Sequence, residues 1–104
     1  MMSLKPGVDM RGLHPEALAA MFIADGVFTS LLSPLVITAV KNGKHKKGSL
    51  HYVGQAFDAR LPSRYVIGNV DRNVVEALKA ALGVQYDVVL EEDHIHVEFD
   101  PKET

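Results

Sequence analysis

Two short stretches of the chain carry side chains that can bind a metal ion. The first stretch contains His51 and Asp58, and the second contains His94 and His96. Two imidazoles and one carboxylate can hold a zinc ion and leave a fourth position open for water, which is the arrangement of a catalytic zinc site. Because the chain has no cysteine, a metal site here must use nitrogen and oxygen ligands.

The second stretch belongs to an apolar segment that we expect to be a β-strand. Side chains alternate between the two faces of a strand, so the apolar residues from Ile95 to Phe99 point to the core. His94 and His96 then point together to the opposite face, which aims two imidazoles at one point. A polar, solvated hairpin face explains a lone His-x-His motif equally well. Glu98 shares this face and either fixes an imidazole tautomer or is simply solvated.

Two segments have the spacing of helices that pack on a sheet. The first begins at Pro15 and ends near Ser30, and the second runs from Asp71 to Leu82. The expected apolar stripe of the first helix is Leu18, Met21 and Phe22. The expected apolar face of the second helix is Val74, Val75, Leu78, Ala81 and Leu82. The sequence Asn73 to Glu76 fits a capping box, and Gly83 is placed to end the second helix.

The remaining apolar segments predict four strands, at residues 35–40, 55–61, 86–90 and 95–99. The last two flank a short acidic turn and form a hairpin in the simplest arrangement. The order α-β-β-α-β-β predicts a single α+β domain over residues 1–104, with helices on one face of a mainly antiparallel sheet.

The composition excludes several classes of protein. A formal net charge of -2 does not indicate nucleic acid or an anionic membrane as a partner. The longest apolar run, Leu31–Val40, has about half the length that a membrane-spanning helix needs, so we expect no membrane insertion. The N-terminus lacks the apolar core of a secretory signal, so we expect synthesis in the cytoplasm without a signal peptide.

The two stretches together form a more specific pattern than either alone. They read S-x-H-x-x-G-x-A-x-D over residues 49–58 and D-H-x-H over residues 93–96. This pattern resembles the zinc site of the D-alanyl-D-alanine peptidase and hedgehog-type superfamily. The resemblance implies that His51, Asp58 and His96 bind one zinc ion. The short chain is most similar to phage and prophage members that cut peptidoglycan.

The resemblance implies a zinc metallopeptidase that hydrolyses amide bonds in peptidoglycan stem peptides, as a carboxypeptidase or an endopeptidase. Such an enzyme acts at the bacterial cell wall as an endolysin or virion component. In many relatives a glutamate three residues before the last zinc ligand is the general base, and Asp93 stands at that position. We expect Asp93 to act as the base and His94 to orient the attacking water or stabilise the oxyanion. The alternative for Asp93 is a plain turn residue.

The candidate substrate contacts are less well defined. Relatives that hydrolyse D-Ala-D-Ala often carry an arginine shortly after the first core strand, where this chain has Lys41. A lysine supplies a charge but no planar fork for a carboxylate, which weakens the case for recognition of a terminal carboxylate and leaves cleavage within the stem peptide open. Ser49 is the other candidate, either bonding substrate or capping its turn. We expect the basic residues 44–47 to be a solvated loop.

Two other functions compete with the peptidase. A non-catalytic, zinc-stabilised cell-wall-binding or virion structural domain of the same fold would explain the aspartate at position 93 and the missing arginine. Under that hypothesis, changes at Asp93 or His94 matter little, whereas in a peptidase they abolish hydrolysis. A different metalloprotein with a three-ligand site explains the residues around His51 less well. A nucleic-acid module has the least support, because there is no basic excess and no aromatic platform.

Overall fold

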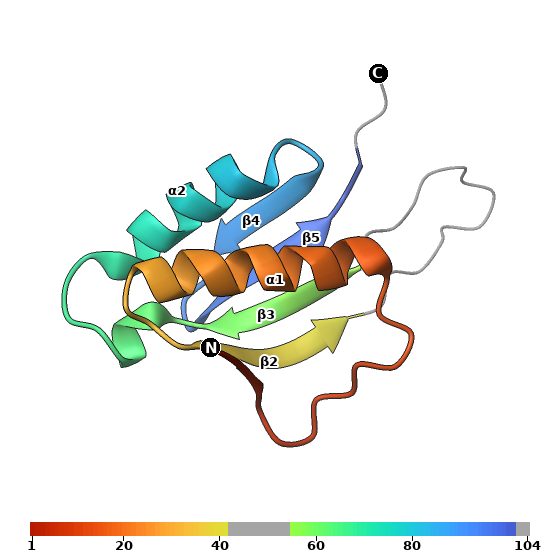
Figure 1. The fold of residues 1–104 in the computed structure, drawn as a ribbon, viewed down its shortest axis with the longest axis horizontal. Coiled ribbons are helices and arrows are strands. Elements are labelled where there is room, and N and C mark those ends of the chain that lie inside the picture. Colours follow the sequence, from red (N-terminus) through yellow and green to blue (C-terminus); the bar gives the residue numbers. More distant parts are fainter. Residues whose placement is uncertain (42–54, 102–104) are drawn as a thin grey trace.

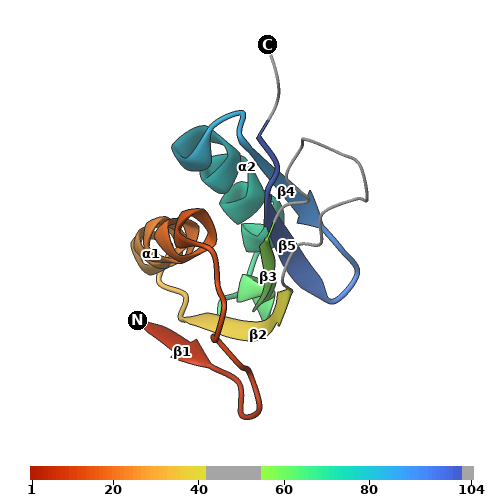
Figure 2. The ribbon, with the colours of Figure 1, turned by 90° about the vertical axis from the view of Figure 1, so that its right-hand side faces the viewer.

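A five-stranded sheet with both helices on one face forms the described part of the protein, residues 1–41 and 55–101 in a computed structural model (Figure 1). In chain order the elements are β1 (Met2–Leu4), α1 (Pro15–Ser30), β2 (Leu35–Lys41), β3 (Ala56–Arg60), a 3₁₀ turn η1 (Pro62–Arg64), α2 (Val70–Leu82), β4 (Tyr86–Leu90) and β5 (His94–Phe99). Figure 2 shows α1 and α2 side by side on the same side of the sheet. The predicted α+β class and the helices on one face are confirmed.

The strands lie in the order β1-β2-β3-β5-β4. β1 is parallel to β2, and every other neighbouring pair is antiparallel. β4 and β5 form the predicted hairpin. β1 was not predicted, because a three-residue strand carries almost no periodic signal and is held here by pairing with β2, far away in the sequence.

The core lies between the helices and the sheet, and α1 contributes to it with small side chains. Its buried residues are Ala17, Ala20, Met21, Ala24 and Phe28. The predicted stripe was therefore wrong for Phe22 and Leu18, which are 62% and 39% exposed. Because α1 is apolar around most of its circumference, spacing alone does not select a face, and the alanine face packs closest to the sheet.

Helix α2 buries Val74, Val75 and Leu78, as predicted, but Ala81 is exposed. It ends at Gly83, whose φ of 83° lies in the left-handed region that glycine adopts readily. The predicted capping box was wrong, because the helix begins at Val70 and no side chain caps it. Neither helix within the described residues has the length and apolar character needed to cross a bilayer.

A carboxylate in the first turn of α2 holds the preceding turn. Asp71 accepts hydrogen bonds from the backbone N–H of Ser63, at 2.8 Å, and from the Ser63 hydroxyl, at 2.7 Å. The negative charge is also favourable at a helix N-terminus. Asp71 therefore holds η1, the turn that follows β3, against the start of α2.

We expect Asp71→Ala to lower the free energy of unfolding by about 1–2 kcal/mol, because two hydrogen bonds and one favourable helix charge are lost. Urea denaturation measures this change. The control is Glu76→Ala in the same helix, which removes only an exposed ion pair with Lys79 and is expected to cost less than about 0.5 kcal/mol. Equal losses in the two variants would contradict the role assigned to Asp71.

Candidate metal centre

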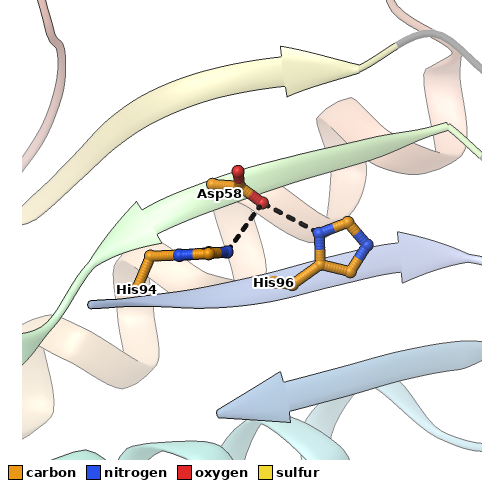
Figure 3. A group of neighbouring side chains, drawn as sticks. All are labelled: Asp58, His94 and His96. Atoms are coloured by element: carbon orange, nitrogen blue, oxygen red, sulfur yellow. Dashed lines mark hydrogen bonds and ion pairs between the residues drawn. The ribbon is translucent and has the colours of Figure 1, made fainter. Parts of the chain in front are cut away.

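Three potential metal ligands meet on the sheet face that the helices leave open. Asp58 comes from β3, and His94 and His96 come from β5 (Figure 3). In the strand register Asp58 lies directly opposite His96. Phe99 N–H donates to the Gln55 carbonyl, so these two residues form a hydrogen-bonded pair. Because pair types alternate along antiparallel strands, Asp58 and His96 form a non-hydrogen-bonded pair, in which side chains approach most closely.

Strand alternation explains why these side chains share a face. In β3, Phe57 and Ala59 are buried in the core, so Asp58 between them points to the other face. In β5, Ile95 and Val97 belong to the core and place the two histidines opposite. The apolar residues thus fix the direction of the polar ones, as predicted for β5.

A bulge in β2 lies beside Asp58. Ile37 pairs with Ala59 and Ala39 pairs with Asp58, so Thr38 is an extra residue in β2. The Thr38 hydroxyl donates to the Asp58 carbonyl at 3.4 Å. Bulges occur often beside functional sites, where they adjust the direction of side chains. This one holds the backbone of Asp58 from the side away from β5.

The ligand atoms have spacing suited to one metal ion. Asp58 Oδ1 lies 2.8 Å from His96 Nδ1 and 3.7 Å from His94 Nε2, and all three ligand atoms lie within 4.8 Å of one another. Around a tetrahedral ion with metal–ligand distances of about 2.1 Å, ligand atoms are about 3.4 Å apart. Small side-chain movements therefore suffice for Asp58, His94 and His96 to hold an ion.

Each histidine also has a carboxylate on its outer nitrogen. Asp93 lies 2.6 Å from His94 Nδ1, and Glu98 lies 3.2 Å from His96 Nε2. A carboxylate accepts a hydrogen bond from the ring N–H and leaves the lone pair on the other nitrogen, which is the usual support for a metal-binding histidine. The inner nitrogens, His94 Nε2 and His96 Nδ1, are the two that face Asp58.

These contacts shift two pKa values. Burial opposes charging of His96, but hydrogen bonds and charges from Asp58 and Glu98 outweigh it, so the pKa of His96 lies above its ordinary value of 6.5. The hydrogen bond from His94 lowers the pKa of the Asp93 carboxyl, which stays ionised at neutral pH. Without a metal, His96 therefore tends to hold a proton in place of the ion.

The structure places some predicted site residues and not others. Asp58 and His96, two predicted ligands, are brought together, and His94 joins them with its Nε2 toward Asp58. Ser49 and His51 lie outside the described residues, so their roles remain predictions. The backbone of Lys41 is in β2, opposite Ala56, and its side chain is outside the described part.

Two features of the open face were not predicted. Asp87, Glu98 and Asp100 form a second group of carboxylates within 4.8 Å of one another, next to the first through Glu98. Arg60, two residues after Asp58 and on the same face, lies opposite His94. The alternation of side chains along residues 56–60 could have predicted that Arg60 shares a face with Asp58. That Arg60 lies opposite His94 could not be predicted, because it depends on how β3 pairs with β5.

A comparison of the chain with protein-family models, with curated proteins and with solved structures found no match. The resemblance to the D-alanyl-D-alanine peptidase and hedgehog-type superfamily therefore stays a prediction from the sequence.

We expect one divalent ion per chain when the metal-free protein is titrated with zinc in a calorimeter. Asp58→Asn and His96→Ala should each weaken binding by more than about a hundredfold, since even the loss of an outer carboxylate costs about ten- to a hundredfold. The control is Asp87→Asn, which changes the second carboxylate group and leaves the first intact. Equal weakening by Asp87→Asn would contradict the assignment.

Metal affinity should depend on pH through His96, because a proton and the ion compete for its Nδ1. Protonation of His96 stabilises the metal-free fold fully below about pH 6.5, and this contribution is lost as the pH rises through the raised pKa. Zinc affinity should therefore fall about tenfold per pH unit below that pKa.

NMR titration of the His96 ring in the metal-free protein measures the competing proton directly. Its midpoint should lie above 6.5 and move to lower pH in Glu98→Gln, which removes one of the two carboxylates that raise it. An affinity that is the same at acidic and neutral pH, or a midpoint that Glu98→Gln does not move, would contradict this account.

Proposed function

We propose that the protein is a zinc-dependent peptidase that hydrolyses amide bonds in peptidoglycan stem peptides, acting at the bacterial cell wall in phage or prophage lysis. The observation that carries the proposal is the group of Asp58, His94 and His96, with a carboxylate behind each imidazole. The spacing of the two motifs, which resembles the D-alanyl-D-alanine peptidase pattern, supports the choice of substrate.

The donor set fits zinc. Two imidazole nitrogens and one carboxylate oxygen are ligands that zinc accepts, and they come from rigid neighbouring strands. Asp58 and His96 would hold the ion, together with His51 if the predicted motif applies. When bound, zinc polarises a scissile carbonyl and makes a water molecule acidic enough to serve as nucleophile near neutral pH.

The contact between Asp93 and His94 supports a division of roles between them. Asp93 accepts from His94 Nδ1–H, so His94 Nε2 carries the lone pair and points to the side of Asp58. In this arrangement His94 Nε2 receives the proton of the attacking water, which exchanges the roles that the sequence predicted for Asp93 and His94. Asp93 orients the ring and stabilises the imidazolium, as a carboxylate does behind a catalytic histidine. The proton then passes from His94 to the leaving amine.

A second candidate function is a non-catalytic metal-stabilised domain that binds the cell wall or is part of a virion. The side chain of Asp93 favours it, because it is 87% exposed and lies on the outer side of His94. The lowered pKa of Asp93 also makes it a weak base on its own. If His94 is a metal ligand instead of a proton acceptor, neither Asp93 nor His94 is left to act as the general base for the attacking water.

Release of peptide fragments from purified peptidoglycan by the zinc-loaded chain, followed by mass spectrometry, separates these functions. For a peptidase, Asp93→Asn should lower kcat/KM by about 10²- to 10⁴-fold, because His94 loses the partner that orients it, while zinc is still bound. The fragments identify the bond that is cut.

The matched control is Glu92→Gln, which removes a neighbouring exposed charge in the same turn and should leave hydrolysis unchanged. Zinc binding without fragment release by the wild type across several wall types would refute the peptidase and favour the non-catalytic domain. If Asp93→Asn and Glu92→Gln had equal effects, Asp93 would be an ordinary turn residue.

A further inference from the structure

An arginine lies opposite one histidine of the candidate metal centre. Arg60 ends β3, two residues after Asp58, so both side chains project from the open face of the sheet. Arg60 is directly opposite His94 in the register, in the same kind of close pair as Asp58 and His96. Side chains in such a pair start about 5 Å apart. The Arg60 side chain thus starts beside that of His94, on the same face as Asp58.

A tyrosine hydroxyl holds the guanidinium. Arg60 Nη1 donates to the Tyr65 hydroxyl at 3.0 Å. Tyr65 follows η1, and its backbone N–H donates to the Pro62 carbonyl. Because Asp71 binds both polar groups of Ser63, the turn that carries Tyr65 is anchored to α2. This chain of contacts orients the arginine without neutralising it.

Most of the hydrogen-bonding capacity of Arg60 is unused within residues 1–41 and 55–101. The bond to Tyr65 uses one N–H, and no carboxylate of these residues lies within ion-pair distance of the guanidinium. By contrast, Arg11 in the N-terminal loop binds both oxygens of Asp9. A planar fork of N–H donors that is half-buried, oriented and without an anion among the described residues is suited to a carboxylate from another molecule.

We propose that Arg60, positioned by Tyr65, binds a carboxylate of the substrate and places the scissile amide over Asp58, His94 and His96. This inference rests on the proposed peptidase function and specifies its substrate: a peptide with a free carboxylate near the cleaved bond. It replaces Lys41 as the cationic contact and supplies the planar fork that the sequence lacked after β2. In a stem peptide the carboxylate comes from the C-terminus or from the α-carboxylate of a γ-linked D-glutamate.

Three forms of one stem pentapeptide distinguish these two sources. The first has both carboxylates free, the second has an amidated C-terminus, and the third has D-isoglutamine in place of D-glutamate. Hydrolysis by the zinc-loaded full chain gives kcat and KM for each form. Calorimetry gives the dissociation constant of each form independently of hydrolysis.

Arg60→Gln should raise KM and the dissociation constant of the fully charged peptide by about ten- to a hundredfold, with a smaller change in kcat. It should have no effect on whichever amidated form has already lost the recognised carboxylate. Arg60→Lys should recover only part of the binding, because it keeps the charge and loses the fork. Tyr65→Phe should reproduce a weaker form of the same loss, and zinc binding should be unchanged in all three variants.

The matched control is Arg72→Gln, which removes an exposed arginine from α2 on the opposite side of the sheet and should leave all constants unchanged. If Arg60→Gln and wild type discriminate equally between the charged and amidated peptides, the proposal is overturned. If the wild type cuts none of the peptides but binds the charged form better through Arg60, the peptidase function fails and carboxylate binding stands. If neither amidation weakens wild-type binding, carboxylate recognition is refuted whatever the hydrolysis.

Discussion

The hydrogen bond between Asp58 and His96 is the interaction on which the rest of the site depends. Asp58 is only 6% exposed, and an ionised carboxylate removed from water is strongly destabilising unless a charge or donor compensates it. His96 supplies that donor across the sheet at 2.8 Å. The contact exists only in one register of β3 on β5, since a slip by one residue would turn Asp58 into the core and Phe57 out of it.

The same register arranges the charges around the ion-binding atoms in layers. The innermost layer is one carboxylate between two imidazoles, and the next is a carboxylate on each outer ring nitrogen. With an ion at the centre, this order would make each imidazole a better electron donor and would leave its lone pair on the inner nitrogen. A polar face that was merely solvated would not require a matching carboxylate behind each ring.

The two faces of the sheet carry different groups: the hydrophobic core lies on one face and the candidate metal ligands lie on the other. One face is covered by α1 and α2 and carries the core. This packing holds the strands that carry Asp58, His94 and His96. The other face carries Asp58, the two histidines and Arg60 within two neighbouring strands. Arg60 and the candidate metal ligands thus project from two neighbouring strands whose pairing fixes their spacing.

Local pattern determined much of this arrangement. The alternation along residues 95–99 placed His94 and His96 together on one face, and the apolar periods located both helices and four strands within a few residues. Asp58 was expected as a ligand from the motif resemblance. The period of two put Glu98 on the histidine face of its strand, as a partner of an imidazole or as a solvated residue, because that period decides which side chains share a face. None of these features depends on residues far away in the chain.

Only the tertiary structure decided which strands are neighbours. Pairing of β3 with β5 brought Asp58 to His96 and Arg60 to His94 across more than thirty residues of sequence. Packing of α1 on the sheet decided that Phe22 is exposed, and pairing with β2 decided that β1 exists. These outcomes follow from packing and cross-strand contacts, whose energies depend on partners that local spacing does not specify.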